Sequence, residues 1–128
     1  MRDRINGPGL IGAALLLCLA FLTEGCNKQN HADAAQPLQQ SFQSAEPEVQ
    51  KAITTVTASL KAGNYTEATK TLAPLVEQRR MTVAQKEAVG VALRQINQAV
   101  AANPALDTRE MYQLRAKMFH AVQSGPRF

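Results

Sequence analysis

The chain has 128 residues and a net charge of +4, contains no tryptophan and has few aromatic residues, whereas alanine and glutamine are common. This composition favours one all-α domain over a β-sheet protein, because Ala and Leu are strong helix formers and alternating β-branched and aromatic residues are missing. The basic residues are scattered along the chain and are not clustered with aromatic residues, so we expect no nucleic-acid binding.

Residues 1–25 have the organisation of a bacterial secretion signal. Arg2 and Arg4 form a short basic region, and the thirteen residues 10–22 that follow contain no charge. A permanent membrane span needs about twenty apolar residues, so this run is short for an anchor and has the right length for a signal peptide. We therefore expect a signal peptide over 1–25 that directs export and is removed before Cys26.

The motif Leu22-Thr23-Glu24-Gly25-Cys26 resembles the lipobox of bacterial lipoproteins, in which a small residue precedes the cysteine that receives the lipid. Gly25 and Cys26 match the family. Thr23 and Glu24 depart from it, because the family usually has Leu and a small uncharged residue at these positions. The resemblance implies lipidation of Cys26, and hence attachment to a membrane of the cell envelope.

The number of cysteines also favours lipidation. Cys18 lies inside the apolar run and leaves with the signal, so Cys26 would be the only thiol of the exported protein, without an intramolecular partner. The alternative is an ordinary cleavage site next to a free cysteine. The product would then be soluble in the periplasm or secreted.

The segment 26–46 is rich in Gln, Ala, Ser and Asn and has few large apolar residues. Such a segment buries too little apolar surface to offset the entropy lost on ordering, so we expect a flexible tether. Leu38 and Phe42 are spaced four residues apart, which leaves open a short helical turn docked on the body.

Residues 47–124 predict a helical domain. Apolar residues at helical spacing define a first helix that starts near Pro47, with Ser44 as a candidate cap, and ends at Gly63. Asn64 is the candidate cap of a second helix. Pro74, inside this second helix, should kink it or end its regular part, because proline lacks the amide hydrogen.

Two more helices follow. Thr82 and the glutamine three residues later form a capping box, which predicts the start of the longest helix, over 83–102. The fourth helix should begin at Asp107 or Thr108 and end before a C-terminal tail, 125–128. Short connections favour antiparallel neighbours, so we expect a small antiparallel bundle of about four helices, built from two αα-hairpins.

Gly63, Asn64, Tyr65 and Ala68 resemble the centre of a tetratricopeptide repeat. In that family, Gly and Asn or Asp form the turn between two helices, Tyr packs back on the first helix, and a small Ala admits close contact. No second copy follows about 34 residues later, whereas a stacked array needs at least three. The resemblance implies a repeat-like hairpin, and the alternative is an ordinary αα-hairpin with a similar turn.

No residue pattern indicates catalysis or a cofactor. The two histidines, His31 and His120, are far apart in the sequence, and the carboxylates are scattered over several predicted elements. Neither a metal-ligand spacing nor a glycine-rich phosphate loop is present. We therefore expect no enzyme, no metal and no cofactor.

The predicted function is a non-catalytic interaction or structural module of the cell envelope, with a protein or peptide partner in its hairpin grooves. The alternative is a periplasmic carrier of a small apolar ligand. For a carrier, the methionine and phenylalanine side of the last helix, with Met111 and Met118, would line a cavity in the bundle.

Overall fold

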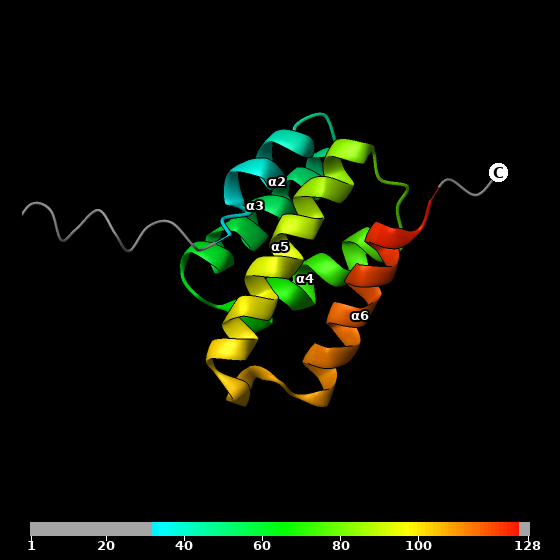
Figure 1. Cartoon of the computed structure of the whole chain (residues 1–128). Coiled ribbons are helices and arrows are strands. Elements are labelled where there is room, and N and C mark those ends of the chain that lie inside the picture. The colour runs from blue at the N-terminus through cyan, green and yellow to red at the C-terminus, as the bar shows by residue number, and fades with distance from the viewer. Residues whose placement is uncertain (1–31, 126–128) are drawn as a thin grey trace, which may run out of the picture. The chain divides into compact units, whose positions relative to one another are not determined.

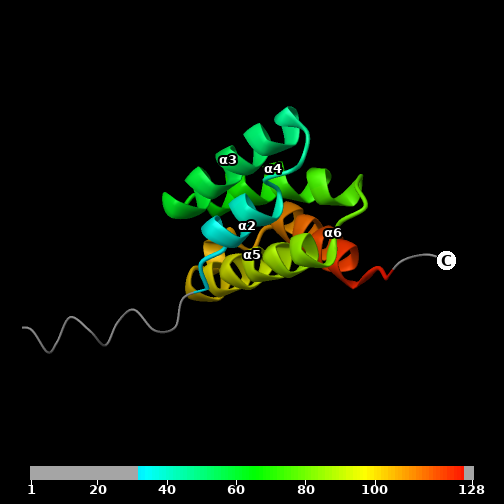
Figure 2. The ribbon, with the colours of Figure 1, turned by 90° about the horizontal axis from the view of Figure 1, so that it is seen from above.

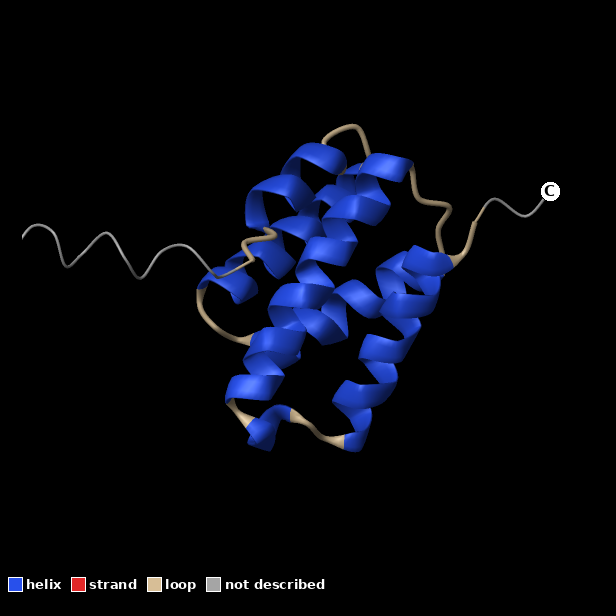
Figure 3. Ribbon diagram, viewed as in Figure 1, coloured by secondary structure: helices blue, strands red, loops and turns tan. Residues whose placement is uncertain are grey.

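The structure, a computed structural model, describes residues 32–125, which form a helical body (Figures 1 and 3). In chain order its elements are α2 (Ala35–Ser41), α3 (Pro47–Lys61), α4 (Tyr65–Glu77), α5 (Val83–Ala102), the 3₁₀ turn η1 (Pro104–Leu106) and α6 (Arg109–Gln123). The described residues contain no strand, so the predicted all-α class is confirmed. The predicted signal segment 1–25, Cys26 and the last three residues of the tail lie outside the described part.

The five α-helices of residues 32–125 form a closed ring around one core, and each has its main contacts with two others. Helix α3 packs on α4, α4 on α6, α6 on α5, α5 on α2, and α2 back on α3. Figure 2 shows α3 and α4 in one layer, α5 and α6 in a second, and α2 beside both. Because α2 closes the ring as a fifth helix, the four-helix arrangement that the sequence predicts is not confirmed.

Helix α2 lies inside the segment 26–46, and for the described part of that segment the prediction of a flexible tether is wrong. Leu38 is completely buried and Phe42 is 3% exposed, both within the hydrophobic core. The amide of Ala34 also donates a hydrogen bond to Oε1 of Gln95 in α5, at 3.0 Å. The alternative of a docked helical turn is therefore confirmed: two large apolar side chains at the right spacing bury enough surface to order a polar segment.

Side-chain caps form at some predicted helix starts and not at others. Oγ1 of Thr82 accepts the amide of Gln85 at 3.1 Å, and Oε1 of Gln85 accepts the amide of Thr82 at 3.0 Å, so the capping box is confirmed. Thr108 caps α6 in the predicted way. The predicted cap Ser44 is wrong, because Glu46 holds the cap position of α3. Asn64 holds the cap position of α4 as predicted, but its side chain accepts no cap hydrogen bond.

Pro74 does not end α4, which continues to Glu77. A proline in a helix interior removes one hydrogen bond and crowds the carbonyl four residues earlier, which favours a break. Leu72 and Val76 on either side of Pro74 are almost completely buried, whereas Pro74 itself is exposed. Packing of these apolar side chains against the core therefore holds the last turn of α4 in helical geometry.

Two glycines give opposite expectations for replacement by alanine. Gly63 follows α3 with a φ of +77°, so Gly63→Ala should lower the free energy of unfolding by about 1 kcal/mol, because an L side chain is strained there. Gly90 lies within α5, and an added Cβ meets no atom within 4 Å. Gly90→Ala should therefore raise the free energy of unfolding by about 1 kcal/mol, because alanine has the higher helix propensity. Urea denaturation of both variants measures the two shifts, and shifts of the same sign would contradict this account.

Candidate functional site

Helix α6 places two kinds of large side chain on different sides. Met111 and Met118 are 1% and 0% exposed and belong to the core, whereas Tyr112 and Phe119 are 66% and 51% exposed. The spacing of seven residues puts the members of each pair on the same side of the helix, two turns apart. The methionines and Phe119 of this helix therefore do not line one common cavity.

A shallow hollow of about 360 Å³ lies between α5 and α6, next to the two exposed aromatic rings. It is open to solvent, and its walls combine apolar, aromatic and polar side chains. Its lining residues are Leu93, Asn97, Tyr112, Arg115, Ala116, Phe119 and His120. Exposed aromatic side chains around a hollow are typical of surfaces that bind another protein. We call these seven residues the α5–α6 face.

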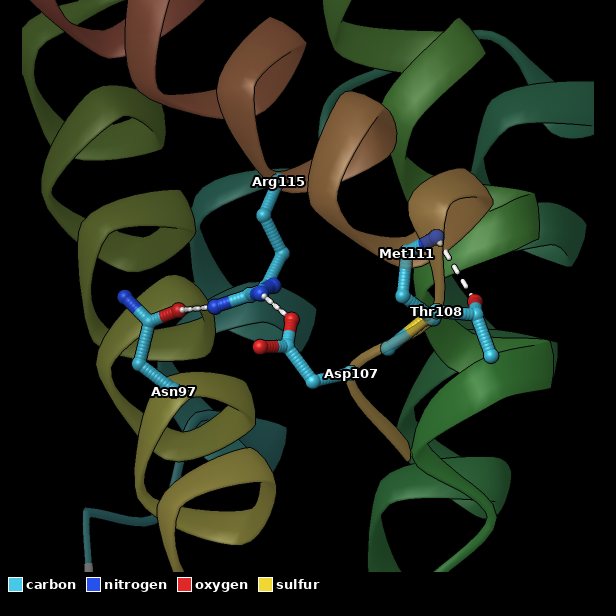
Figure 4. A network of polar contacts seen from close by, with 5 residues as sticks. All are labelled: Asn97, Asp107, Thr108, Met111 and Arg115. Carbon is cyan, nitrogen blue, oxygen red and sulfur yellow. Dashed lines mark hydrogen bonds and ion pairs between the residues drawn. The ribbon is translucent and has the colours of Figure 1, made fainter. Parts of the chain in front are cut away.

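A polar network centred on Arg115, which together with Asn97 belongs to this face, joins the helices (Figure 4). Nη1 of Arg115 donates to Oδ1 of Asn97 in α5 at 2.9 Å, and Nη2 donates to Oδ1 of Asp107 at 2.5 Å. Asp107 precedes Thr108, whose Oγ1 accepts the amide of Met111 at 3.1 Å. The network thus links α5, the connection 103–108 and the first turn of α6, and Asp107 balances the charge of Arg115.

Other charged residues form exposed ion pairs between helices. Nζ of Lys70 in α4 lies 3.5 Å from Oε2 of Glu110 in α6, and Nζ of Lys117 in α6 lies 3.3 Å from Oε2 of Glu77 in α4. The two ion pairs join α4 to α6 at two points. Exposed pairs of this kind contribute about 0–1 kcal/mol each. Within the described residues, no group of three His, Cys, Asp or Glu side chains is arranged to hold a metal ion.

Of the two histidines and the cysteine that the sequence singled out, His120 alone lies within the described residues. Cys26, the predicted lipidation site, and His31 lie outside the described residues, so lipidation stays a prediction. His120 is exposed on α6, where its ring meets the ring of Phe119 edge-on at a centroid distance of 6.1 Å. Among the helices described here, none is both long enough and apolar enough to span a bilayer.

Sequence reasoning missed the two exposed aromatic residues, although a signal for them is present. Tyr112 and Phe119 each follow a core methionine directly, so they repeat with the same spacing along a neighbouring stripe of α6. Aromatic residues outside the apolar stripe of an amphipathic helix point to a binding surface. No sequence signal indicates that Leu93 and Asn97 of α5 line the same hollow, because only the packing of α5 on α6 brings them next to the two aromatic residues.

No protein-family model matches the chain, and neither a curated protein nor a solved structure matches it significantly. Function is therefore inferred from the residues of this chain alone.

Proposed function

We propose that this protein is an exported, lipid-anchored, non-catalytic interaction module of the bacterial cell envelope. The observation that supports it best is the α5–α6 face, where Tyr112 and Phe119 stand exposed beside a hollow. Aromatic side chains contribute a large share of the binding energy when a partner buries them. On this proposal the face binds a protein, and neither a substrate nor a nucleic acid.

An apolar helix of another envelope protein suits this face. The charge of Arg115 is balanced by Asp107, so the hollow carries little net charge and favours a neutral partner surface. A groove between two packed helices accepts the side-chain ridge of a third helix. Asn97 and His120 in the lining offer hydrogen bonds to polar groups of the partner.

Membrane attachment through Cys26 is the second part of the proposal. Its support is the uncharged run 10–22, whose length suits a signal peptide, and the Gly25-Cys26 pair that resembles a lipobox. A lipid on Cys26 would supply the membrane affinity, since each buried methylene contributes about 0.8 kcal/mol. The folded body would then present the α5–α6 face to a partner close to the membrane.

We also infer that the body consists of two αα-hairpins, α3–α4 and α5–α6, with α2 packed on α3 and α5. The connections 62–64 and 103–108 are short, which favours antiparallel neighbours. Gly63 has the left-handed backbone that a repeat-like turn needs, and Ala68 is fully buried, which suits close helix contact. These features support a tetratricopeptide-like geometry for the first hairpin.

A carrier of a small apolar ligand is the weaker alternative. A carrier would need methionine and phenylalanine side chains of α6 around one cavity. Met111 and Met118 are instead packed in the core, and Phe119 is half exposed. The hollow on the α5–α6 face is open to solvent, whereas carriers enclose most of the surface of an apolar ligand. Neither of these two observations favours the carrier over the interaction module.

The anchor is tested by the mass of the native protein and by cell fractionation. Mass spectrometry should find an acylated Cys26 at the N-terminus, and Cys26→Ser should move the protein from the membrane fraction to the soluble fraction. Cys18→Ser is the matched control, because Cys18 leaves with the signal. A mature protein with a free Cys26 would rule out the lipid anchor.

The partner is tested by cross-linking and affinity capture from envelope extracts. The double variant Tyr112→Ala/Phe119→Ala should lose a partner that the unchanged protein captures, because the two exposed rings supply the apolar contacts. Gln113→Ala, at an exposed position of α6 outside the hollow, should keep it. Equal capture by the double variant and the unchanged protein would exclude the α5–α6 face as the binding surface.

A further inference from the structure

A second and larger hollow, of about 630 Å³, lies at the end of the body where the loop 78–82 joins α4 to α5. The end of α4, this loop, the first turn of α5 and the last turn of α6 surround it. Val76, Met81 and Ala121 supply apolar lining, while Arg79, Arg80 and Lys86 supply positive charge. We call it the basic hollow, and the α5–α6 face does not share any of these residues.

The charge of this hollow is only partly balanced within the described residues. Arg79 lies 3.5 Å from Glu46, but both side chains are well exposed, so the pair is weak. Arg80 has no carboxylate within ion-pair distance among residues 32–125. Nζ of Lys86 donates a hydrogen bond to the backbone carbonyl of Ser124, a neutral group, so its charge is not cancelled.

The one acidic residue in the lining does not change this balance. Glu77 lies 3.3 Å from Nζ of Lys117, which is not part of the lining, and both side chains are about half exposed, so the lining carries three cations against this one carboxylate. A hollow with apolar walls and an excess of cations attracts a ligand that combines negatively charged groups with an apolar group. Both an acidic peptide and an anionic lipid meet that description.

The position of the hollow favours the peptide. The chain joins the body beside the C-terminal half of α5, where the amide of Ala32 donates to Oε1 of Gln98 at 3.4 Å. Val83, at the basic hollow, lies fifteen residues before Gln98, or about 22 Å along the helix. Cys26 precedes Ala32 by only six residues, which span at most about 20 Å.

An anchored Cys26 would keep Ala32 within about 20 Å of the bilayer, whereas the basic hollow lies toward the opposite end of α5. We propose that the basic hollow binds an acidic peptide segment of a partner protein, with carboxylates meeting Arg80 and Lys86 and an apolar side chain packing on Met81. The choice of a peptide over a lipid head group rests on the proposed anchor at Cys26. The binding surface itself depends only on the folded body.

The test is fluorescence anisotropy with the purified full chain and a labelled peptide composed of Glu and Leu. The peptide should bind, and added salt should weaken it, because the contacts involve exposed charges. A matched peptide with Lys in place of Glu should not bind. Arg80→Glu should weaken binding by about fivefold or more, since it removes one attraction and adds one repulsion.

Arg94→Glu is the matched control, because Arg94 is an exposed residue of α5 outside the hollow and the change in charge is the same. It should alter the affinity by less than about twofold. Equal losses for the two variants, or no binding of the acidic peptide, would overturn the proposal. So would tighter, Arg80-dependent binding to phosphatidylglycerol vesicles. None of these outcomes depends on whether Cys26 is acylated, so failure of this proposal and failure of the proposed anchor are distinguishable.

Discussion

Leu38→Ala is expected to lower the free energy of unfolding by about 3 kcal/mol, although it changes a residue in a polar, alanine-rich segment. Leu38 is completely buried in α2, which packs on α3 and α5, and replacing it with alanine leaves a cavity in addition to the lost apolar surface. The total free energy of unfolding of a small domain is about 5–15 kcal/mol, so this change removes a large part of the stability. Urea denaturation followed by circular dichroism measures the shift.

Gln40→Ala is the control for this change, because Gln40 is an exposed residue of the same helix. It should change the stability by less than about 0.5 kcal/mol. If Leu38→Ala had as small an effect as Gln40→Ala, α2 would not be docked in solution, and the tether predicted for 26–46 would extend through this helix.

Met118→Ala and Phe119→Ala are expected to separate stability from binding at neighbouring positions of α6. Met118 is completely buried in the core, so its truncation should cost about 3 kcal/mol. Phe119 is half exposed and its ring lies on the α5–α6 face, so its truncation should cost less than about 1 kcal/mol. Denaturation of both variants measures the two costs.

A second measurement on the same pair is capture of the envelope partner at a temperature where both variants are folded. Phe119→Ala should lose the partner and Met118→Ala should keep it, because only Phe119 is accessible. The opposite result, or a large loss of stability in Phe119→Ala, would show that the ring of Phe119 is part of the core and that the α5–α6 face is not a binding surface.

Much of the helical content follows from local sequence. The four helices predicted after residue 46 are all present, and the predicted ranges for α3 and α5 agree with Pro47–Lys61 and Val83–Ala102. The apolar spacing of each helix, the capping box at Thr82 and the left-handed glycine at position 63 are interactions between residues close in the chain. Such local signals can be recognised without knowledge of what each helix packs against.

The sequence by itself determined the all-α class, most helix boundaries and the predictions about export and Cys26. Only the tertiary structure decided that α2 is part of the body, that α4 continues through Pro74, and that Tyr112 and Phe119 stand beside a hollow while Met111 and Met118 are buried. The reason is physical: each of these features depends on contacts between helices distant in the chain. Burial of Leu38 in the core outweighs the local preference of a polar segment for disorder. The spacing of Leu38 and Phe42 left a docked turn open, but it does not show the surfaces of α3 and α5 on which α2 packs.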